Sequence, residues 1–278
     1  MSENPSIAAA FRQPQPKSTP TADDIVTICA ISIIAGVLAN ILHEGVGHGL
    51  VALLTGVKSG LLTTVAWSSD ADTRLVAAGG TLVNLAAGLG LWLVLRSAKS
   101  AALPMRYFLL LSCAFNSFTG TGYFFFSGLT DFGDWSIVIK GTHPHWLWRT
   151  LLVVVGAASY YAAVRVVGVG IVRYVGVPRD QPGRLQKLTV VPYLAAIVLS
   201  TTAGLLNPLG IQLVWQSALP ATAGGQSGLL WFQYYIPRGT VPNQLAESLV
   251  RNDVWIITAA VLGLLFVVVL GRGITLHW

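Results

Sequence analysis

The sequence predicts an all-α polytopic membrane protein with about six transmembrane helices. Of its 278 residues, 54% are hydrophobic and only 10% are charged, whereas a soluble domain carries about 25% charged residues. Uncharged apolar stretches of about 20 residues, the length that crosses a bilayer, recur along the chain. Lipid is therefore expected to solvate much of the surface. The net charge of +6 is interpreted as an orientation signal in membrane loops, not as a nucleic-acid surface.

A flexible polar tail, residues 1–24, is expected to precede the spans, which follow at 25–56, 75–95, 107–130, 146–172, 188–207 and 254–271. A re-entrant or interfacial segment is expected near 211–236, because prolines and the Gly224-Gly225 pair interrupt a long uncharged stretch there. If that segment also crosses the membrane, the protein has seven spans. With six spans, the inner segments hold more basic residues when both termini are cytoplasmic, so we expect that orientation.

The first expected helix carries His43, Glu44 and His48 within six residues. Ionisable groups at membrane depth are costly and need a compensating role. Zinc provides one, because neutral imidazoles bind the ion and a neighbouring glutamate can take a proton from the water that it activates. The histidines are five positions apart, instead of the four of His-Glu-x-x-His, so they diverge by about 140° on a regular helix. A π-helical bulge, eased by the intervening glycines, is predicted to bring them together.

A third metal ligand is expected from the end of the third helix, where Asp131 and Asp134 follow. The first and third helices run in the same direction, so their C-terminal parts lie at similar depth. The alternative is a polar helix end at the membrane interface. In the second helix, Asn84 needs a hydrogen-bond partner within the membrane. It is expected either to contact substrate or to join two helices.

These elements resemble the site-2 protease family of intramembrane zinc metalloproteases, on the runs 43–50 and 79–84 and the two aspartates. The resemblance implies a three-helix catalytic core, residues 25–135, followed by C-terminal membrane helices in 136–278. It implies that Zn²⁺ is held by His43, His48 and either Asp134 or Asp131. Glu44 would be the general base and Asn84 would orient substrate, which would be a transmembrane protein or peptide.

Two other functions remain open. A membrane transporter or channel would also place polar residues inside a helical bundle. A non-catalytic membrane protein could also bind a metal ion through the same ligand residues. In each case lipid is the expected surrounding and nucleic acid is not a partner. The expected location is the inner membrane of a bacterial cell.

Overall fold

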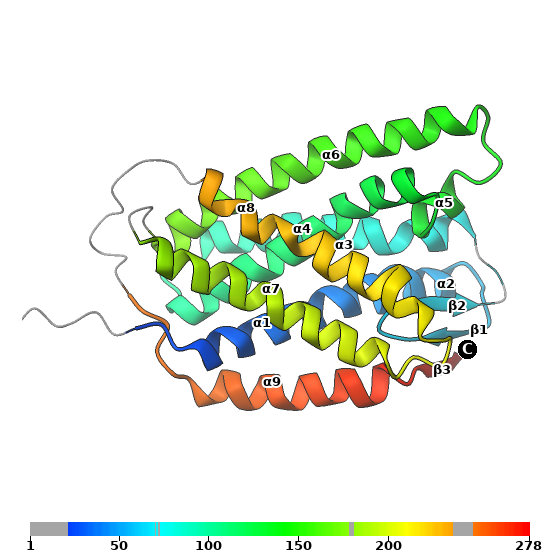
Figure 1. Ribbon diagram of the computed structural model, residues 1–278. Coiled ribbons are helices and arrows are strands. Elements are labelled where there is room, and N and C mark those ends of the chain that lie inside the picture. Colours follow the sequence, from blue (N-terminus) through cyan, green and yellow to red (C-terminus); the bar gives the residue numbers. More distant parts are fainter. Residues whose placement is uncertain (1–21, 70, 72, 178–180, 236–246) are drawn as a thin grey trace, which may run out of the picture.

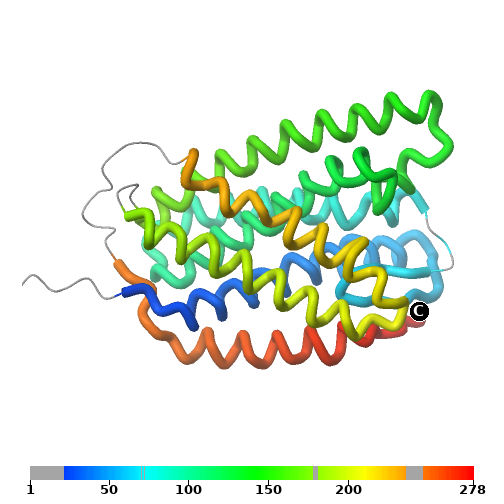
Figure 2. Tube along the Cα trace, viewed as in Figure 1, coloured from blue at the N-terminus to red at the C-terminus, as the bar shows by residue number. Residues whose placement is uncertain are grey.

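Long helices run along a common axis in the computed structural model of the protein (Figures 1 and 2), which describes residues 22–69, 71, 73–177, 181–235 and 247–278. The expected flexible tail therefore lies almost wholly outside the described residues. Most of the described chain is helical, as predicted. Three helices continue without interruption into π-helical turns. The segments are α1 (Ile25–Asn40) with η1 (Ile41–Leu50) and α2 (Val51–Leu54), α3 (Arg74–Ser97), α4 (Leu103–Thr130), α5 (Asp134–Val138), α6 (His145–Gly170) with η2 (Ile171–Val175), α7 (Pro182–Gly204), and α9 (Asp253–Leu265) with η7 (Phe266–Leu270).

Five helices among the described residues are long and apolar enough to cross a membrane: Ile25–Leu54, Arg74–Ser97, His145–Val175, Pro182–Gly204 and Asp253–Leu270. Each corresponds to an expected span. The remaining expected span, 107–130, is also helical, as part of α4. It is less apolar than the others because serine, threonine, asparagine and glycine interrupt its hydrophobic residues. Such residues permit close packing and hydrogen bonds between helices, which suits a central position.

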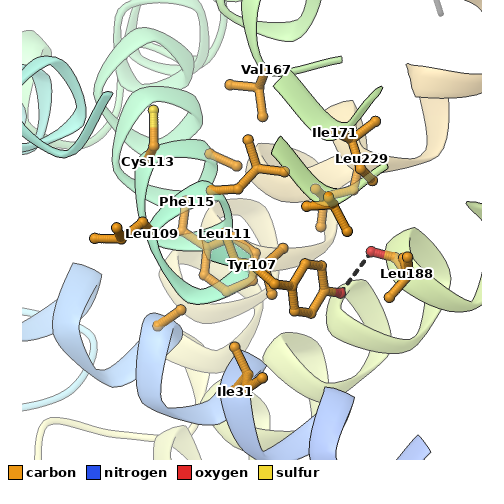
Figure 3. Close-up of a cluster of buried hydrophobic side chains, with 14 of the residues drawn as sticks. Ile31, Tyr107, Leu109, Leu111, Cys113, Phe115, Val167, Ile171, Leu188 and Leu229 are labelled. Atoms are coloured by element: carbon orange, nitrogen blue, oxygen red, sulfur yellow. Dashed lines mark hydrogen bonds between the residues drawn. The ribbon is translucent and has the colours of Figure 1, made fainter. Parts of the chain in front are cut away.

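Helix α4 packs against α1, α3 and α6 and forms the centre of the bundle. Tyr107, Leu111 and Phe115 point from it into the largest apolar cluster (Figure 3). Tyr107 is fully buried, and its hydroxyl donates a hydrogen bond to the Leu188 carbonyl of α7 at 2.8 Å. The phenol therefore fills the core without leaving a polar atom unpaired.

Ion pairs hold together the end of the bundle where α1 begins. Arg184 bonds the Asp23 carboxylate at 2.8 Å, and Arg106 bonds that of Glu247 at 2.8 Å. The next residue, Asp24, caps α1, and hydrogen bonds from the Thr27 hydroxyl and backbone hold the pKa of Asp24 below its ordinary value. These contacts join the starts of α1, α4 and α7 to the segment that leads into α9.

The segment expected to be re-entrant or interfacial is helical over most of its described length. It comprises η3 (Val214–Ala218), η4 (Pro220–Gly224), η5 (Gly225–Ser227) and α8 (Gly228–Tyr235). At its start Ser217 bonds the Val65 carbonyl, and near its end Phe232 lies against Gly168 of α6. It crosses the bundle from one end to the other (Figure 1, yellow to orange). The number of membrane spans, six or seven, stays a prediction.

Helix α1 begins at one end of the bundle and the C-terminus lies at the opposite end (Figure 1). The expected cytoplasmic position of both termini stays a prediction.

A small sheet closes the end of the bundle that holds the C-terminus. It consists of β1 (Ser59–Leu62), β2 (Trp67–Ser69) and β3 (Ile274–His277), in the antiparallel order β2-β1-β3. The Trp67 ring lies directly over Gly60, where a Cβ atom would collide with it. The structure thus adds this small sheet to the predicted, mostly helical architecture. The sheet joins the hairpin between α2 and α3 to the C-terminal strand that follows η7.

Candidate metal centre

The π-helical segment η1 brings the two histidines together. Its backbone hydrogen bonds join residues five positions apart, which brings His43 and His48 to the same face instead of letting them diverge. Their Nε2 atoms are 3.3 Å apart and the ring planes are 86° apart. Both side chains are buried. The bulge inferred from the sequence is therefore present and extends over the whole run Ile41–Leu50.

Close contact with α3 holds this turn in place. A Cβ atom on Gly47 would collide with the Gly80 backbone, and one on Gly79 would collide with the Gly47 carbonyl. The glycines of η1 and α3 therefore let the two backbones touch, and this leaves the histidine rings directed at the surface of α3. A Cβ atom on Gly80 would lie 2.5 Å from His48 Nε2 and 2.8 Å from His43 Nε2.

Asp134 is the third member of the group. It is the first residue of α5, after a turn in which Gly133 has a φ of 81°. Its Oδ2 lies 3.3 Å from His43 Nε2 and 3.5 Å from His48 Nε2. Among the described residues, these three side chains form a group whose ligand atoms all lie within 4.8 Å of one another, close enough to hold a metal ion.

The other candidate, Asp131, is directed elsewhere. It ends α4 in the left-handed conformation, with a φ of 56°. Its carboxylate bonds His145 Nε2 at 3.1 Å and lies 3.8 Å from Arg149. The sequence left two aspartates open, and the turn at Gly133 separates them, with Asp134 facing the histidines. His145 is occupied by Asp131, so the His143-Pro144-His145 run adds nothing to the group.

In each histidine ring, the hydrogen bond at Nδ1 determines that Nε2 is the nitrogen without a proton. His48 Nδ1 lies 2.8 Å from the Val76 carbonyl, which can only accept, so this nitrogen carries the proton. His43 Nδ1 lies 2.5 Å from Asn84 Oδ1 and is the donor for the same reason. In neutral rings both Nε2 atoms then present lone pairs to each other and to a carboxylate oxygen. Three acceptors in contact repel unless a cation lies among them, so this donor set fits a metal ion.

Asn84 joins neighbouring helices, which is one of the two roles expected of it. It is fully buried, and its amide nitrogen donates to Ala39 O at 3.1 Å and to Asn116 Oδ1 at 2.7 Å. Its oxygen is used by His43. It is also absent from the described residues that line the large cavity beside the site. Its bonds therefore orient the His43 ring and join α1, α3 and α4, and a contact between Asn84 and substrate stays a prediction.

Replacing Asn84 with leucine is expected to weaken metal binding about 10- to 100-fold, the usual effect of losing a partner that orients a histidine ligand. Competition with a chromophoric chelator, using zinc as the probe ion, measures this affinity. The matched control is Asn207→Leu, which removes another buried asparagine that bonds Thr63 and not the site. Equal affinity in Asn84→Leu and wild type would contradict the orienting role.

Glu44 adjoins the ligands on the same turn of η1. Its side chain is buried, and Trp67 lines the same cavity beside it. Its Oε2 has no hydrogen-bond partner among the described residues. A buried acceptor without a partner is costly unless the site brings it one. The geometry therefore leaves one carboxylate oxygen next to the three ligands free for a proton or a water.

A cavity of about 710 Å³ opens from the site. Glu44, His48 and Asp134 form its polar end, and Trp67 of β2 adjoins them. The remainder lies among α4, α6 and residues 213–231 and is lined mostly by aromatic and aliphatic side chains, among them Phe118, Tyr123, Phe125, Phe126, Tyr160 and Trp231. Its volume is within the range of sites for organic ligands.

Several residues around the site were not identified from the sequence. Tyr123 stacks on the His43 ring, with centroids 4.7 Å apart. Asn116 supports Asn84. A buried asparagine in α4, at a depth similar to that of Asn84, was a signal that could have identified the second of these, because each amide in a membrane helix needs a partner. Nothing in the sequence distinguished Tyr123 from the other aromatic residues of α4.

The geometry of the site stands without support from known proteins. Comparisons of the chain with protein-family models, with curated proteins and with solved structures find no match.

Proposed function

We propose that this protein is a zinc metalloprotease that hydrolyses peptide bonds in transmembrane segments. The observation that carries the proposal is the convergence of His43, His48 and Asp134 beside Glu44, at the polar end of an apolar cavity. Two histidines and one carboxylate, with room left for a water, are a usual ligand set of catalytic zinc.

The separation of the ligand atoms supports zinc. Ligands placed tetrahedrally at about 2.0–2.1 Å from zinc lie about 3.3–3.4 Å from one another. The three separations among His43 Nε2, His48 Nε2 and Asp134 Oδ2 are 3.3, 3.3 and 3.5 Å. Nitrogen ligands also favour zinc over magnesium or calcium, which take oxygen ligands.

Each residue then has a role in hydrolysis. Zinc, when bound, would act as a Lewis acid and lower the pKa of a water so far that a weak base can take its proton. Glu44 takes a proton from the attacking water through its free oxygen and later gives it to the departing amine nitrogen. The water oxygen adds to the carbonyl carbon, the C–N bond breaks, and a carboxylic acid and an amine result. Asn84 and the Val76 carbonyl keep both imidazoles correctly oriented throughout.

Two features support a peptide from a membrane segment as substrate. The cavity is largely apolar, so it suits hydrophobic side chains. Trp67 of the sheet-edge strand β2 lines the cavity together with Glu44, so this edge strand adjoins the catalytic carboxylate. A peptide that pairs with such an edge is extended, and its backbone is then exposed to attack, unlike that of a helix.

The charges support an orientation in the inner membrane of a bacterium. Basic residues flank mainly the end of the bundle where α1 begins, and this end is therefore proposed to be cytoplasmic. The described ones at that end are Arg96, Lys99, Arg106, Arg173, Arg184, Lys187 and Arg251, against Lys58, Arg74, Lys140, Arg149 and Arg272 at the sheet end. The metal centre is nearer the sheet, so the proposed cleavage occurs towards the outer side.

Glu44→Gln tests the proposal. Without a base, cleavage of a model transmembrane peptide in detergent or liposomes is expected to fall by about 10²–10⁴-fold. Zinc content is expected to stay at the wild-type level, because Glu44 is not one of the three ligands. The matched control is Asp253→Asn, which neutralises an exposed carboxylate at the far end of the bundle and is expected to change neither value.

Other outcomes would identify other functions. Cleavage by Glu44→Gln at the wild-type rate would refute the assignment of the base. Wild-type protein that binds zinc but cleaves no membrane peptide would indicate a non-catalytic metal protein. Purified wild-type protein that binds no zinc would favour a transporter or channel, in which the buried polar residues line a pathway.

A further inference from the structure

A second, smaller cavity adjoins Glu44. Its volume is about 70 Å³, and it is lined by residues of α1, α4, α7 and the helical segment that begins at η3. Several residues line both this cavity and the large one, among them Glu44 and Tyr123. The smaller cavity therefore reaches Glu44 through a lining that is partly separate from that of the large cavity.

Four residues that line this cavity each carry a buried polar atom without a hydrogen-bond partner among the described residues. They are Asn40 Oδ1, Glu44 Oε2, Thr64 Oγ1 and Gln226 Oε1. The side chains of Glu44, Thr64 and Gln226 are all more than nine-tenths buried. Polar atoms with this degree of burial are nearly always paired in native proteins. Four such atoms around one small space indicate that they share a ligand.

The ligand has to donate hydrogen bonds. The amide nitrogen of Asn40 already donates to the Thr64 carbonyl at 2.8 Å, and that of Gln226 donates to Thr119 Oγ1 at 3.0 Å. What remains on both residues is an oxygen acceptor. A second cation is disfavoured, because three of the four groups are neutral and the fourth adjoins the proposed zinc, whose charge would repel it.

We propose that this cavity is a binding site for a small cluster of ordered waters in contact with Glu44. A water needs about 10–15 Å³ of such space and two to four polar partners, and the cavity offers room and acceptors for several. The hydroxyl of Thr64 can both donate and accept, so it can link waters held by Asn40 and Gln226.

This site deepens the proposed function and rests on it for its purpose. Each peptide bond that is hydrolysed consumes one water. A hydrophobic segment that fills the large cavity would displace water from that side of Glu44. The smaller cavity provides the co-substrate to Glu44, and Gln226 and Asn40 act as positioning residues for it.

Gln226→Leu is the decisive variant, because leucine has a similar size and offers no acceptor. We expect kcat for the model peptide to fall about tenfold or more while KM and zinc content remain at wild-type values. Thr222→Val is the matched control: it alters the same cavity lining, but removes a hydroxyl that already bonds Ala218 O at 2.6 Å. We expect it to turn over like wild type.

An experimental structure that resolves waters gives a second, activity-independent readout. Wild-type protein is expected to show water density within hydrogen-bond distance of Gln226 Oε1 and Glu44, and Gln226→Leu is expected to lose the first of these waters. A dry cavity in a wild-type map that shows waters elsewhere in the interior would overturn the proposal, as would an unchanged kcat in Gln226→Leu. A protein that binds no zinc would refute the proposed function alone, and the density would still decide the water site.

Discussion

Purified Asp134→Ala is expected to contain less than about one-tenth of an equivalent of zinc, whereas wild type is expected to contain about one equivalent per chain. A catalytic zinc site has three protein ligands, and loss of one leaves two histidines that cannot complete it. His48→Ala is expected to have the same effect, because each residue contributes one of the three converging atoms. Mass spectrometry of the metal content, after dialysis against a weak chelator, measures the stoichiometry.

Asp131→Ala is the control for this experiment. Asp131 is only three residues away and also carries a carboxylate, but it pairs with His145 and Arg149 instead. Zinc is expected to stay at about one equivalent in this variant. Retention of zinc in Asp134→Ala together with its loss in Asp131→Ala would refute this assignment and identify Asp131 as the ligand.

A single methyl group on Gly80 is expected to destroy the metal centre. The added Cβ would lie 2.5 Å from His48 Nε2 and 2.7 Å from His43 Cε1, inside van der Waals contact and on the side of the rings where the metal binds. Neither ring can retreat easily, because both Nδ1 atoms are held. Zinc binding in Gly80→Ala is expected to be lost, with an overpacking cost of about 1–3 kcal/mol in the free energy of unfolding.

The same helix provides the control. A Cβ atom on Gly90 of α3 would meet nothing within 4 Å among the described residues. Gly90→Ala is therefore expected to bind zinc fully and to be slightly more stable, since alanine favours a helix by about 1 kcal/mol over glycine. The melting temperature and zinc content of both variants, compared with wild type, check the prediction. Normal zinc content in Gly80→Ala would show that η1 and α3 are less closely packed than described.

The sequence predicts the helical architecture well, because each expected span is a long, largely apolar run whose length the bilayer sets. It also allowed the histidine pair to be recognised in spite of its spacing, since two imidazoles and a carboxylate need a reason to be buried. The choice between Asp131 and Asp134 depended on the φ angle of Gly133 and on the partner of Asp131. Neither can be read from residue types alone.

Other features depend on contacts between distant parts of the chain. The sheet combines residues near 60 with the last residues of the chain, and strands of three or four residues carry too little periodicity to be predicted. The segment 212–235 is broken in sequence by Pro220 and the glycines. Its π-helical and 3₁₀ turns absorb these residues without ending the helix, so the sequence suggested an interruption that is absent from its described part.

The π-helical turn of η1, whose hydrogen bonds join residues five positions apart, has a consequence for recognising relatives. A signature written around histidines four positions apart presumes an ordinary α-helix and passes over any chain that builds the same ligand pair on a wider turn. Here the wider turn is inseparable from the two adjacent glycines of α3 and from the asparagine four positions after the second of them. The searchable pattern is therefore His-Glu-x-x-x-His followed by Gly-Gly-x-x-x-Asn. Its first part corresponds to the π-helical turn, and its second part to the residues of α3 that pack against this turn.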